Sequence, residues 1–401
     1  MSGKPLFSYF LSNSDYPITP DRTIWKAPFP LSRKDVCGYP VKEDDVPISH
    51  GDYFHSVRSF LEQDRFEILA SAVSQYLDRN IEPDEIQEIR ICLEKHGEFY
   101  HPARIVVEMN GTEFSFVLNV AVSSAGNVFI RAEYEILQRL NIDFPSPFIP
   151  GVYGQGQVPI EGRKLTLRMF LGEWFEGFNE FHISTDKTDG KQKVLVWDPV
   201  HGDFFLSSDQ AKELYSQAAM ILTCYYDIET FEHISLWHHA AGDFVVKLQD
   251  GKIDLRLITV RRYAPMFGEI EAQEEASASQ LMLEALLVFF LNLTLRMRLD
   301  RLDGIGDMTW ADNVAVEGAL DGFFRGLAMK AEDGIIPEPF VGFFQHYLSR
   351  CTQADLLDLS VSITNKFNPL AAEIAVINEN LKAHTTVLFN AIQKYDQNDG
   401  S

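Results

Sequence analysis

Residues 236–246 read LWHHAAGDFVV and combine side chains that could carry chemistry. An imidazole exchanges a proton near neutral pH, so His238 could act as a general base, and with Asp243 it could bind a divalent ion. The alternative is that one histidine packs under the loop while the other is solvated. Because neighbouring loop residues diverge, a metal ion is expected to bind one of His238 and His239 rather than both.

A zinc site is a second interpretation of this stretch. The set that could bind zinc consists of His233, His238, His239 and Asp243. The spacing of the histidines, HxxxxHH, differs from the HExxH arrangement, in which two histidines share one face of a helix with a glutamate between them. The spacing therefore disfavours zinc.

The composition excludes several function classes. The chain of 401 residues is 46% hydrophobic and has a formal net charge of -23, from 58 acidic and 35 basic residues. This length accommodates two or three lobes. An acidic surface repels phosphate backbones and anionic lipids, so binding to nucleic acid and binding to membranes are both disfavoured.

The cysteines and the apolar stretches indicate a cytoplasmic protein. The four cysteines are scattered and form no CxxC pair, which disfavours a zinc ribbon and a disulfide framework. The N-terminus has no basic segment followed by a long apolar one, so no signal peptide is expected. The most apolar stretch, residues 281–295, contains Glu284 and Asn292 and is predicted to be a buried helix.

Hydrophobic periodicity predicts an α+β protein. Residues 1–50 are rich in proline and are expected to wrap a surface, and residues 53–80 are expected to form one or two amphipathic helices. β-rich runs follow, broken by Asn110-Gly111, which is a strong hairpin signal. One helix at 127–141 and two more strands complete a compact lobe.

From Ser207 onward the chain is expected to be mainly helical, starting with a Ser/Asp-capped helix. The opening stretch then leads into two strands joined at Asp250-Gly251, and an apolar helix follows at 279–299. The glycines of GVYGQGQV are predicted to form a tight turn, because no helix follows them as phosphate binding would require.

The order of these elements resembles the protein-kinase/aminoglycoside-phosphotransferase superfamily. A five-stranded lobe has one helix after its third strand, and a long helix, a short loop, a strand pair and further helices follow. The resemblance covers roughly residues 86–310 and depends on element order more than on motif identity. It implies a two-lobed kinase-like fold: an N-terminal extension (1–85), a small β-rich N-lobe with one helix (86–176) and a larger helical C-lobe (177–401).

The resemblance assigns roles to residues of the N-lobe. The lysine of the third strand, which binds phosphates, corresponds to Asn119 in FVLNVAVS. Its carboxylate partner on the next helix corresponds to Glu133 or Glu135, unless these glutamates form a solvated helix face. The hinge that receives adenine corresponds to residues 171–177, which include Glu173.

The catalytic loop of such phosphotransferases reads HGDxxxxN, and the opening stretch stands in its place. Asp243 then corresponds to the metal-binding asparagine, and His238 corresponds to the catalytic aspartate. The metal-binding aspartate after the strand pair corresponds to Thr259, with Asp254 as the alternative in another register. Because the lysine and both aspartates are replaced, the standard kinase mechanism is not expected.

Two further groups have open roles. The turn KHGEFYHPAR contributes His96, Tyr100, His101 and Arg104. These side chains either contact a ligand or form a capped turn. Arg261 and Arg262 either contact an anionic ligand or pair with the acidic run at 269–275, and ion pairing is favoured because it forms readily at an acidic surface.

These replacements favour a pseudokinase-like binding or regulatory module whose partner, a protein or a small molecule, the sequence does not identify. The alternative is an atypical ATP-dependent phosphotransferase for small molecules or proteins. In that alternative His238 and Asp243 replace the usual carboxylates, and ATP with Mg is the cofactor. A third hypothesis is a small-molecule or metal-binding enzyme in which the kinase-like order of elements is accidental.

Overall fold

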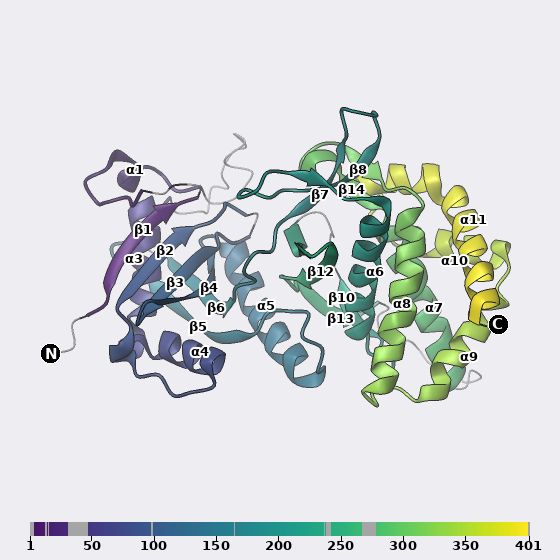
Figure 1. Ribbon diagram of the computed structural model, residues 1–401, viewed down its shortest axis with the longest axis horizontal. Coiled ribbons are helices and arrows are strands. Elements are labelled where there is room, and N and C mark those ends of the chain that lie inside the picture. Colours follow the sequence, from purple (N-terminus) through teal and green to yellow (C-terminus); the bar gives the residue numbers. More distant parts are fainter. Residues whose placement is uncertain are drawn as a thin grey trace. The chain divides into compact units, whose positions relative to one another are not determined.

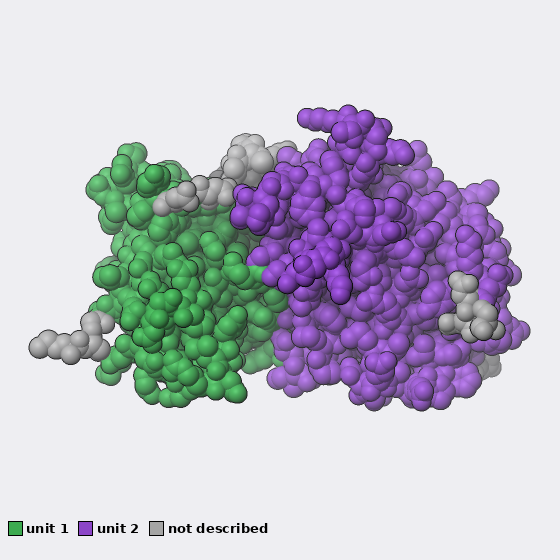
Figure 2. All heavy atoms as spheres, viewed as in Figure 1, with its two compact units in different colours: residues 1–139, 150–176 green, residues 140–149, 177–401 purple. Residues whose placement is uncertain are grey.

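The computed structural model describes residues 4–12, 14, 16–30, 47–97, 99–163, 165–235, 237, 242–266 and 278–399. The chain forms two compact units, residues 1–139 with 150–176 and residues 140–149 with 177–401. Figure 2 colours the two units separately. Each unit contains both strands and helices, so the protein has mixed α and β structure.

The first unit contains a six-stranded sheet and four of the described helices (Figure 1). Its strands are β1 (Leu6–Leu11), β2 (Glu88–Leu93), β3 (Ala103–Met109), β4 (Thr112–Ala121), β5 (Val152–Pro159) and β6 (Thr166–Glu173). They are arranged in the order β1-β2-β3-β4-β6-β5. Its helices are α1 (Thr23–Lys26), α3 (His50–Leu61), α4 (Glu67–Leu77) and α5 (Ser124–Asp143). The last residues of α5, from Leu140 onward, belong to the second unit.

Five of these strands have the order that the sequence predicts. β3 and β4 form a hairpin in which Asn110 and Gly111 have positive φ values of 51° and 77°, as a type I′ turn requires. The pairs β2–β3, β4–β6 and β5–β6 are also antiparallel. The helix α5 follows β4, the third of these five strands.

The N-terminal segment differs from the expectation of a surface wrap. β1 joins the sheet as a sixth strand and pairs in parallel with β2. Tyr9, Trp25 and Phe29 are buried in the same hydrophobic core as the sheet. The prolines predict an irregular segment, but the burial of these three aromatic side chains makes them part of the core.

The helices α3 and α4 approach β5 closely because two positions of the strand have no side chain. A Cβ atom at Gly154 would lie 2.9 Å from Cδ1 of Ile68, and one at Gly156 would lie 2.8 Å from Cε2 of Phe60. These glycines lie within β5, which is the first of the two strands predicted after the helix, so the prediction of a tight turn for GVYGQGQV is wrong. Their small size permits the contact between helix and sheet.

The second unit contains short sheets and six helices among its described residues (Figure 1). Its strands are β7 (Phe181–Thr185), β8 (Gln192–Val196), β9 (Phe204–Phe205), β10 (Glu232–Ser235), β11 (Phe244–Gln249), β12 (Lys252–Leu257), β13 (Arg262–Pro265), β14 (Leu299–Arg301) and β15 (Met308–Trp310). Its helices are α6 (Ser208–Cys224), α7 (Ala278–Arg296), α8 (Val314–Glu332), α9 (Glu338–Ser349), α10 (Gln353–Thr364) and α11 (Glu373–Asp399).

The strands of this unit form the sheet β7-β8-β9 and the pairs β10-β13, β11-β12 and β14-β15. The pair β11-β12 is the strand pair that the sequence predicts. The three-stranded sheet at residues 181–205 was not expected, and it shows that the part after residue 176 is not purely helical.

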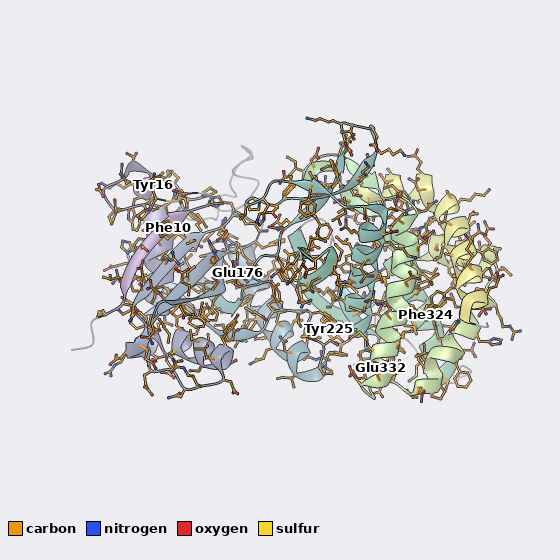
Figure 3. The ribbon with its side chains drawn as sticks, in the orientation of Figure 1. Phe10, Tyr16, Glu176, Tyr225, Phe324 and Glu332 are labelled. Atoms are coloured by element: carbon orange, nitrogen blue, oxygen red, sulfur yellow. The ribbon has the colours of Figure 1, made fainter. Side chains whose placement is uncertain are left out.

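α6 begins at the predicted cap. The Ser207 side chain accepts a hydrogen bond from the Gln210 N–H, and the Gln210 side chain accepts one from the Ser207 N–H. Directly after the helix, the hydroxyl of Tyr225 (Figure 3) donates to the carbonyl of Ser146 at 2.5 Å. Both ends of α6 are therefore fixed by specific hydrogen bonds.

α6 and α8 lie side by side (Figure 1) because glycines of α8 face α6. Gly318, Gly322 and Gly326 recur every four residues and share one face of the helix. A Cβ atom at Gly322 would lie only 1.9 Å from the carbonyl oxygen of Ser216. The backbones of the two helices are therefore in direct contact.

α7 contains the apolar stretch that the sequence predicts to be a buried helix. Among the described residues, its segment Ser279–Arg296 is the one helix long and apolar enough to cross a membrane, and 50% of that segment is buried inside the protein. Phe290 of α7 packs on Phe323 of α8 with 4.7 Å between ring centroids. Next to Phe323, Phe324 (Figure 3) stacks on Tyr395 of α11. Half of this segment of α7 is thus buried in the second unit.

Candidate functional site

Asp243 lies directly before β11 and has 0% of its surface exposed. Arg261, which follows β12, donates hydrogen bonds from Nη1 to Oδ2 (2.6 Å) and from Nη2 to Oδ1 (2.5 Å) of this carboxylate. The Arg261 side chain is 25% exposed. A bidentate guanidinium is a strong partner for a carboxylate, and a buried carboxylate requires such a partner to remain charged.

The β11–β12 hairpin positions this pair. Asp250 and Gly251 have positive φ values of 53° and 76°, so the strands turn tightly and Phe244 comes to lie opposite Leu257. The Ile258 N–H then donates to the Asp243 carbonyl at 2.7 Å, which extends the pairing beyond β12. The segment after β12 therefore runs beside Asp243 and places Arg261 at its carboxylate.

The pair limits the chemistry of Asp243. Both carboxylate oxygens are hydrogen-bonded to Arg261, so a divalent ion bound there would have to displace the guanidinium or compete with its charge. His238 and His239 lie outside the described residues. The expected cooperation of His238 with Asp243 therefore stays a prediction.

The two positions considered for a second metal-binding carboxylate lie in β12 and just after it. Thr259 is half-buried between Ile258 and Arg261 and offers a hydroxyl group where the resemblance implies a carboxylate. Asp254 pairs with Arg256 in its own strand. Leu257 is the residue of β12 nearest to Asp243, because it pairs with Phe244. Asp254 lies three residues before Leu257, which is about 10 Å along an extended strand.

In the first unit, strand alternation separates Asn119 from Glu173. Asn119 lies opposite Phe170, whereas Glu173 lies opposite Phe116, three positions from Asn119 in β4. Successive side chains of a strand point to opposite faces, so Asn119 and Glu173 belong to different faces of the sheet. The Glu173 carboxylate accepts a hydrogen bond from the Gly151 N–H at 3.1 Å and thereby ties the end of β6 to the chain before β5.

The two glutamates of α5 have different environments. Glu133 is buried, whereas the Glu135 side chain is 55% exposed and pairs with Arg131 at 2.9 Å. Glu135 therefore belongs to a solvated helix face, where an ion pair contributes little to stability. α5 covers the face of the sheet that carries Asn119, because Tyr134 of α5 contacts Phe170.

These side chains do not fit the magnesium-binding and nucleotide-binding sites of a kinase. Asn119 supplies no cation for phosphate, Thr259 supplies no carboxylate for a metal ion, and Asp243 is held by Arg261. Among the residues that the structure describes, no group of three or more His, Cys, Asp or Glu side chains is arranged to hold a metal ion.

The turn between β2 and β3 is ordered by its own hydrogen bonds. The Gly97 N–H donates to the carbonyl of Tyr100 at 3.0 Å. Arg104 donates to Glu94 at 3.0 Å, and its guanidinium lies 5.5 Å from the ring centroid of Trp174. Burial raises the pKa of Glu94, and the charge of Arg104 opposes that shift. These contacts support the capped-turn interpretation for this part of the cluster.

His96 and His101 of this turn meet residues that the sequence did not single out. Their Nδ1 atoms lie 3.0 Å apart. His50 of α3 and Phe29 join them, with ring contacts from Phe29 to all three imidazoles. Residues 27–55 contain several aromatic residues and histidines, which could have indicated a cluster. No local sequence pattern connects them to the turn between β2 and β3.

A buried polar pair in the second unit was also missed. Oδ2 of Asp300 accepts a hydrogen bond from the Ile183 N–H at 2.6 Å, and Oδ1 lies 3.9 Å from Nδ1 of His182. The imidazole packs on Trp197, with 4.4 Å between ring centroids. The pair therefore ties β7 to β14, which are far apart in the sequence.

No family model matches this chain, and no curated protein matches it. Among solved structures it is similar to WaaP in complex with acyl carrier protein, with 10% identity and a TM-score of 0.26 over 61% of this chain and 83% of that one. It is also similar to the twitchin kinase region from C. elegans, with 12% identity and a TM-score of 0.29 over 75% of this chain and about half, 51%, of that one. TM-scores this low carry no argument about fold or function.

Proposed function

We propose that this protein is a kinase-like binding or regulatory module that does not perform standard metal-dependent phosphotransfer. The kinase-like character is supported by the order of elements in the first unit, where α5 follows the third of five antiparallel strands. The observation that argues most directly against metal-dependent phosphotransfer is the buried Asp243–Arg261 pair.

The physical argument concerns charge. Phosphoryl transfer depends on metal ions and cations that neutralise the charge of the transferring group. Arg261 already neutralises Asp243 inside the protein, so little negative potential remains there to attract a magnesium ion. The amide of Asn119 is neutral, so it lacks the charge with which a lysine would bind phosphate.

The proposed binding partner is a protein or a small molecule in a reducing cytoplasm. Cys92, Cys224 and Cys351 are free thiols, which is in keeping with that compartment. The acidic surface, with a net charge of -23, disfavours a nucleic-acid partner.

Thermal unfolding with nucleotide tests the proposal. The melting temperature of the full chain is measured with ATP plus Mg, with ATP plus Mn and with ATP plus EDTA. A ligand at about 100 times its Kd adds about 2.7 kcal/mol to the stability of the folded state, which is readily measured. We expect the same melting temperature with and without the metal ion, and no difference between Asp243→Asn and the matched control Asp254→Asn in this response.

A metal-dependent rise in the melting temperature of the wild type would overturn the proposal. If that rise persisted in Asp254→Asn but vanished in Asp243→Asn, it would identify Asp243 as a metal ligand. The atypical phosphotransferase is then tested by transfer of the ATP γ-phosphate, which His238→Ala should abolish. Under our proposal, His238→Ala leaves partner binding unchanged.

A further inference from the structure

Three histidines from distant parts of the first unit meet around Phe29. His50 is the first residue of α3, and His96 and His101 lie in the turn between β2 and β3. The ring centroid of Phe29 is 5.0 Å from those of His50 and His96 and 4.9 Å from that of His101. We refer to His50, His96 and His101 as the three-histidine cluster.

The cluster lies where three segments of the first unit are hydrogen-bonded to one another. The Phe29 N–H donates to the Ile48 carbonyl at 2.8 Å, and Nδ1 of His50 lies 3.2 Å from the Ala27 carbonyl. The Tyr53 hydroxyl donates to the His101 carbonyl at 2.7 Å. Residues 27–30, the start of α3 and the turn after β2 are therefore held together at one point.

The bond between His96 and His101 depends on the protonation of whichever imidazole accepts it, because the donating imidazole can add its second proton at Nε2 and keep the bond. Their Nδ1 atoms are 3.0 Å apart, so one nitrogen donates a proton and the other must accept it. A neutral accepting imidazole already has its proton on Nε2, and it becomes charged only by adding a proton at Nδ1. That second proton removes the acceptor and breaks the bond.

The surroundings of the cluster also disfavour positive charge. His50 lies at the positive end of the α3 dipole, and its ring centroid is 6.3 Å from that of His96. Burial lowers the pKa of His96, and the charge of His50 lowers it further. Two carboxylates of the neighbouring segments are each paired with an arginine: Glu94 with Arg104 at 3.0 Å, and Asp52 of α3 with Arg163 at 3.1 Å. Tyr53 stays protonated, because burial raises its pKa well above the usual value.

We propose that the three-histidine cluster is an acid-sensitive latch. At neutral pH it holds residues 27–30 and the turn after β2 against α3, and acidification releases both. The folded form favours neutral imidazole, so the opened form binds more protons below the ordinary histidine pKa of 6.5. The latch is therefore fully closed above that pH and weakens as the pH falls toward the lowered pKa of His96.

Release of the turn would also affect α5, because the turn contacts the start of this helix. The ring of Phe99 in the turn lies 4.5 Å from that of Phe129 in α5. A Cβ atom at Gly126 in the first turn of α5 would lie 2.4 Å from the Phe99 carbonyl oxygen. The latch thus connects a proton-binding event to the N-terminus of the helix that covers the Asn119 face of the sheet.

Hydrogen–deuterium exchange with mass spectrometry tests the latch in the full chain. Protection is compared at about pH 7.5 and about pH 5.5, on either side of the ordinary histidine pKa, after correction for intrinsic exchange rates. We expect a loss of protection of about tenfold or more at the lower pH in peptides covering residues 27–30, 47–53 and 99–101. His96→Gln keeps hydrogen-bonding groups but cannot titrate, and it should suppress this loss.

The matched control is His201→Gln, which removes a histidine that is 81% exposed and pairs with Asp198 in the second unit. This variant should lose protection at low pH as the wild type does. The proposal is overturned if wild-type protection does not change with pH, or if His96→Gln opens at the same pH as the wild type. Titration of the imidazole proton signals of the wild type by NMR gives a second measurement, and an ordinary pKa for His96 would also overturn it.

Discussion

Arg261 donates two parallel hydrogen bonds to the carboxylate of Asp243, and that carboxylate has no exposed surface. The carboxylate is thus removed from water, and the guanidinium of Arg261 compensates its charge. Arg261 also follows directly on the segment whose Ile258 N–H bonds to the Asp243 carbonyl. The pair therefore helps to hold the segment after β12 against the start of β11. Removing the pair affects the stability of the fold and not only ligand binding.

Arg261→Gln should lower the free energy of unfolding by about 3 kcal/mol, because it leaves the buried charge of Asp243 without its partner. Urea unfolding followed by circular dichroism measures this loss. The double variant Asp243→Asn/Arg261→Gln should be more stable than Arg261→Gln alone, since it removes the buried charge as well.

The matched control for this experiment is Lys212→Gln. Lys212 pairs with Asp321 at 3.0 Å, but these side chains are 40% and 38% exposed, so the loss should be about 0–1 kcal/mol. Equal losses in Arg261→Gln and Lys212→Gln would contradict the burial of the Asp243 charge.

Gly322→Ala should destabilise the second unit by about 2 kcal/mol or more, because its Cβ atom would overlap the Ser216 carbonyl of α6. Gly342→Ala in α9 is the control, since its Cβ atom would meet no described residue within 4 Å. Alanine has the higher helix propensity, so this control should gain about 0.5–1 kcal/mol. Thermal unfolding of both variants distinguishes the effects, and a gain at both positions would refute the close contact of α6 and α8.

Features that depend on neighbouring residues were predictable from the sequence. Asn110-Gly111 and Asp250-Gly251 adopt positive φ at both turn positions, and these residue types favour that conformation by themselves. The cap at Ser207 is equally local, because its partner Gln210 is three residues away.

Features that depend on distant residues were not predictable in this way. The parallel pairing of β1 with β2 joins Leu6 to Glu88, and no local pattern indicates it. The role of Asp243 as a metal ligand was inferred from its residue type beside His238 and from the resemblance, while its partner Arg261 lies eighteen residues further on. The glycines of α8 did carry a signal, their spacing of four residues, but that spacing does not say which helix faces them.

Asp300→Ala should lower the stability of the second unit by about 1–3 kcal/mol, because it leaves the buried Ile183 N–H without its acceptor. Asp307→Ala is the control, since Asp307 is exposed and lies in the connection from β14 to β15. Denaturant unfolding should show little change in the control. A similar small effect at both positions would mean that the Asp300 carboxylate does not hold β7 in place.

The stability of the second unit should fall at acidic pH because His384 is buried as a neutral imidazole. Its Nε2 lies 3.4 Å from the Thr294 hydroxyl, its Nδ1 has no hydrogen-bond partner among the described residues, and its exposed fraction is zero. Burial, and then the charge of Arg298, lowers the pKa of His384 from 6.5 to about 3. The unfolded chain therefore binds a proton that the folded chain does not, from pH 6.5 downward.

The contribution of His384 is thus complete above pH 6.5 and is lost as the pH falls toward about 3, at up to about 1.4 kcal/mol per pH unit. His384→Leu should remove this dependence from the unfolding free energy, measured in urea between about pH 7 and about pH 4.5. His233, whose pKa burial lowers to about 4, adds a similar slope, so the variant should reduce the slope without abolishing it. His346→Gln, at an exposed position of α9, should retain the full slope, and an unchanged slope in His384→Leu would show that this imidazole is protonated in the folded protein.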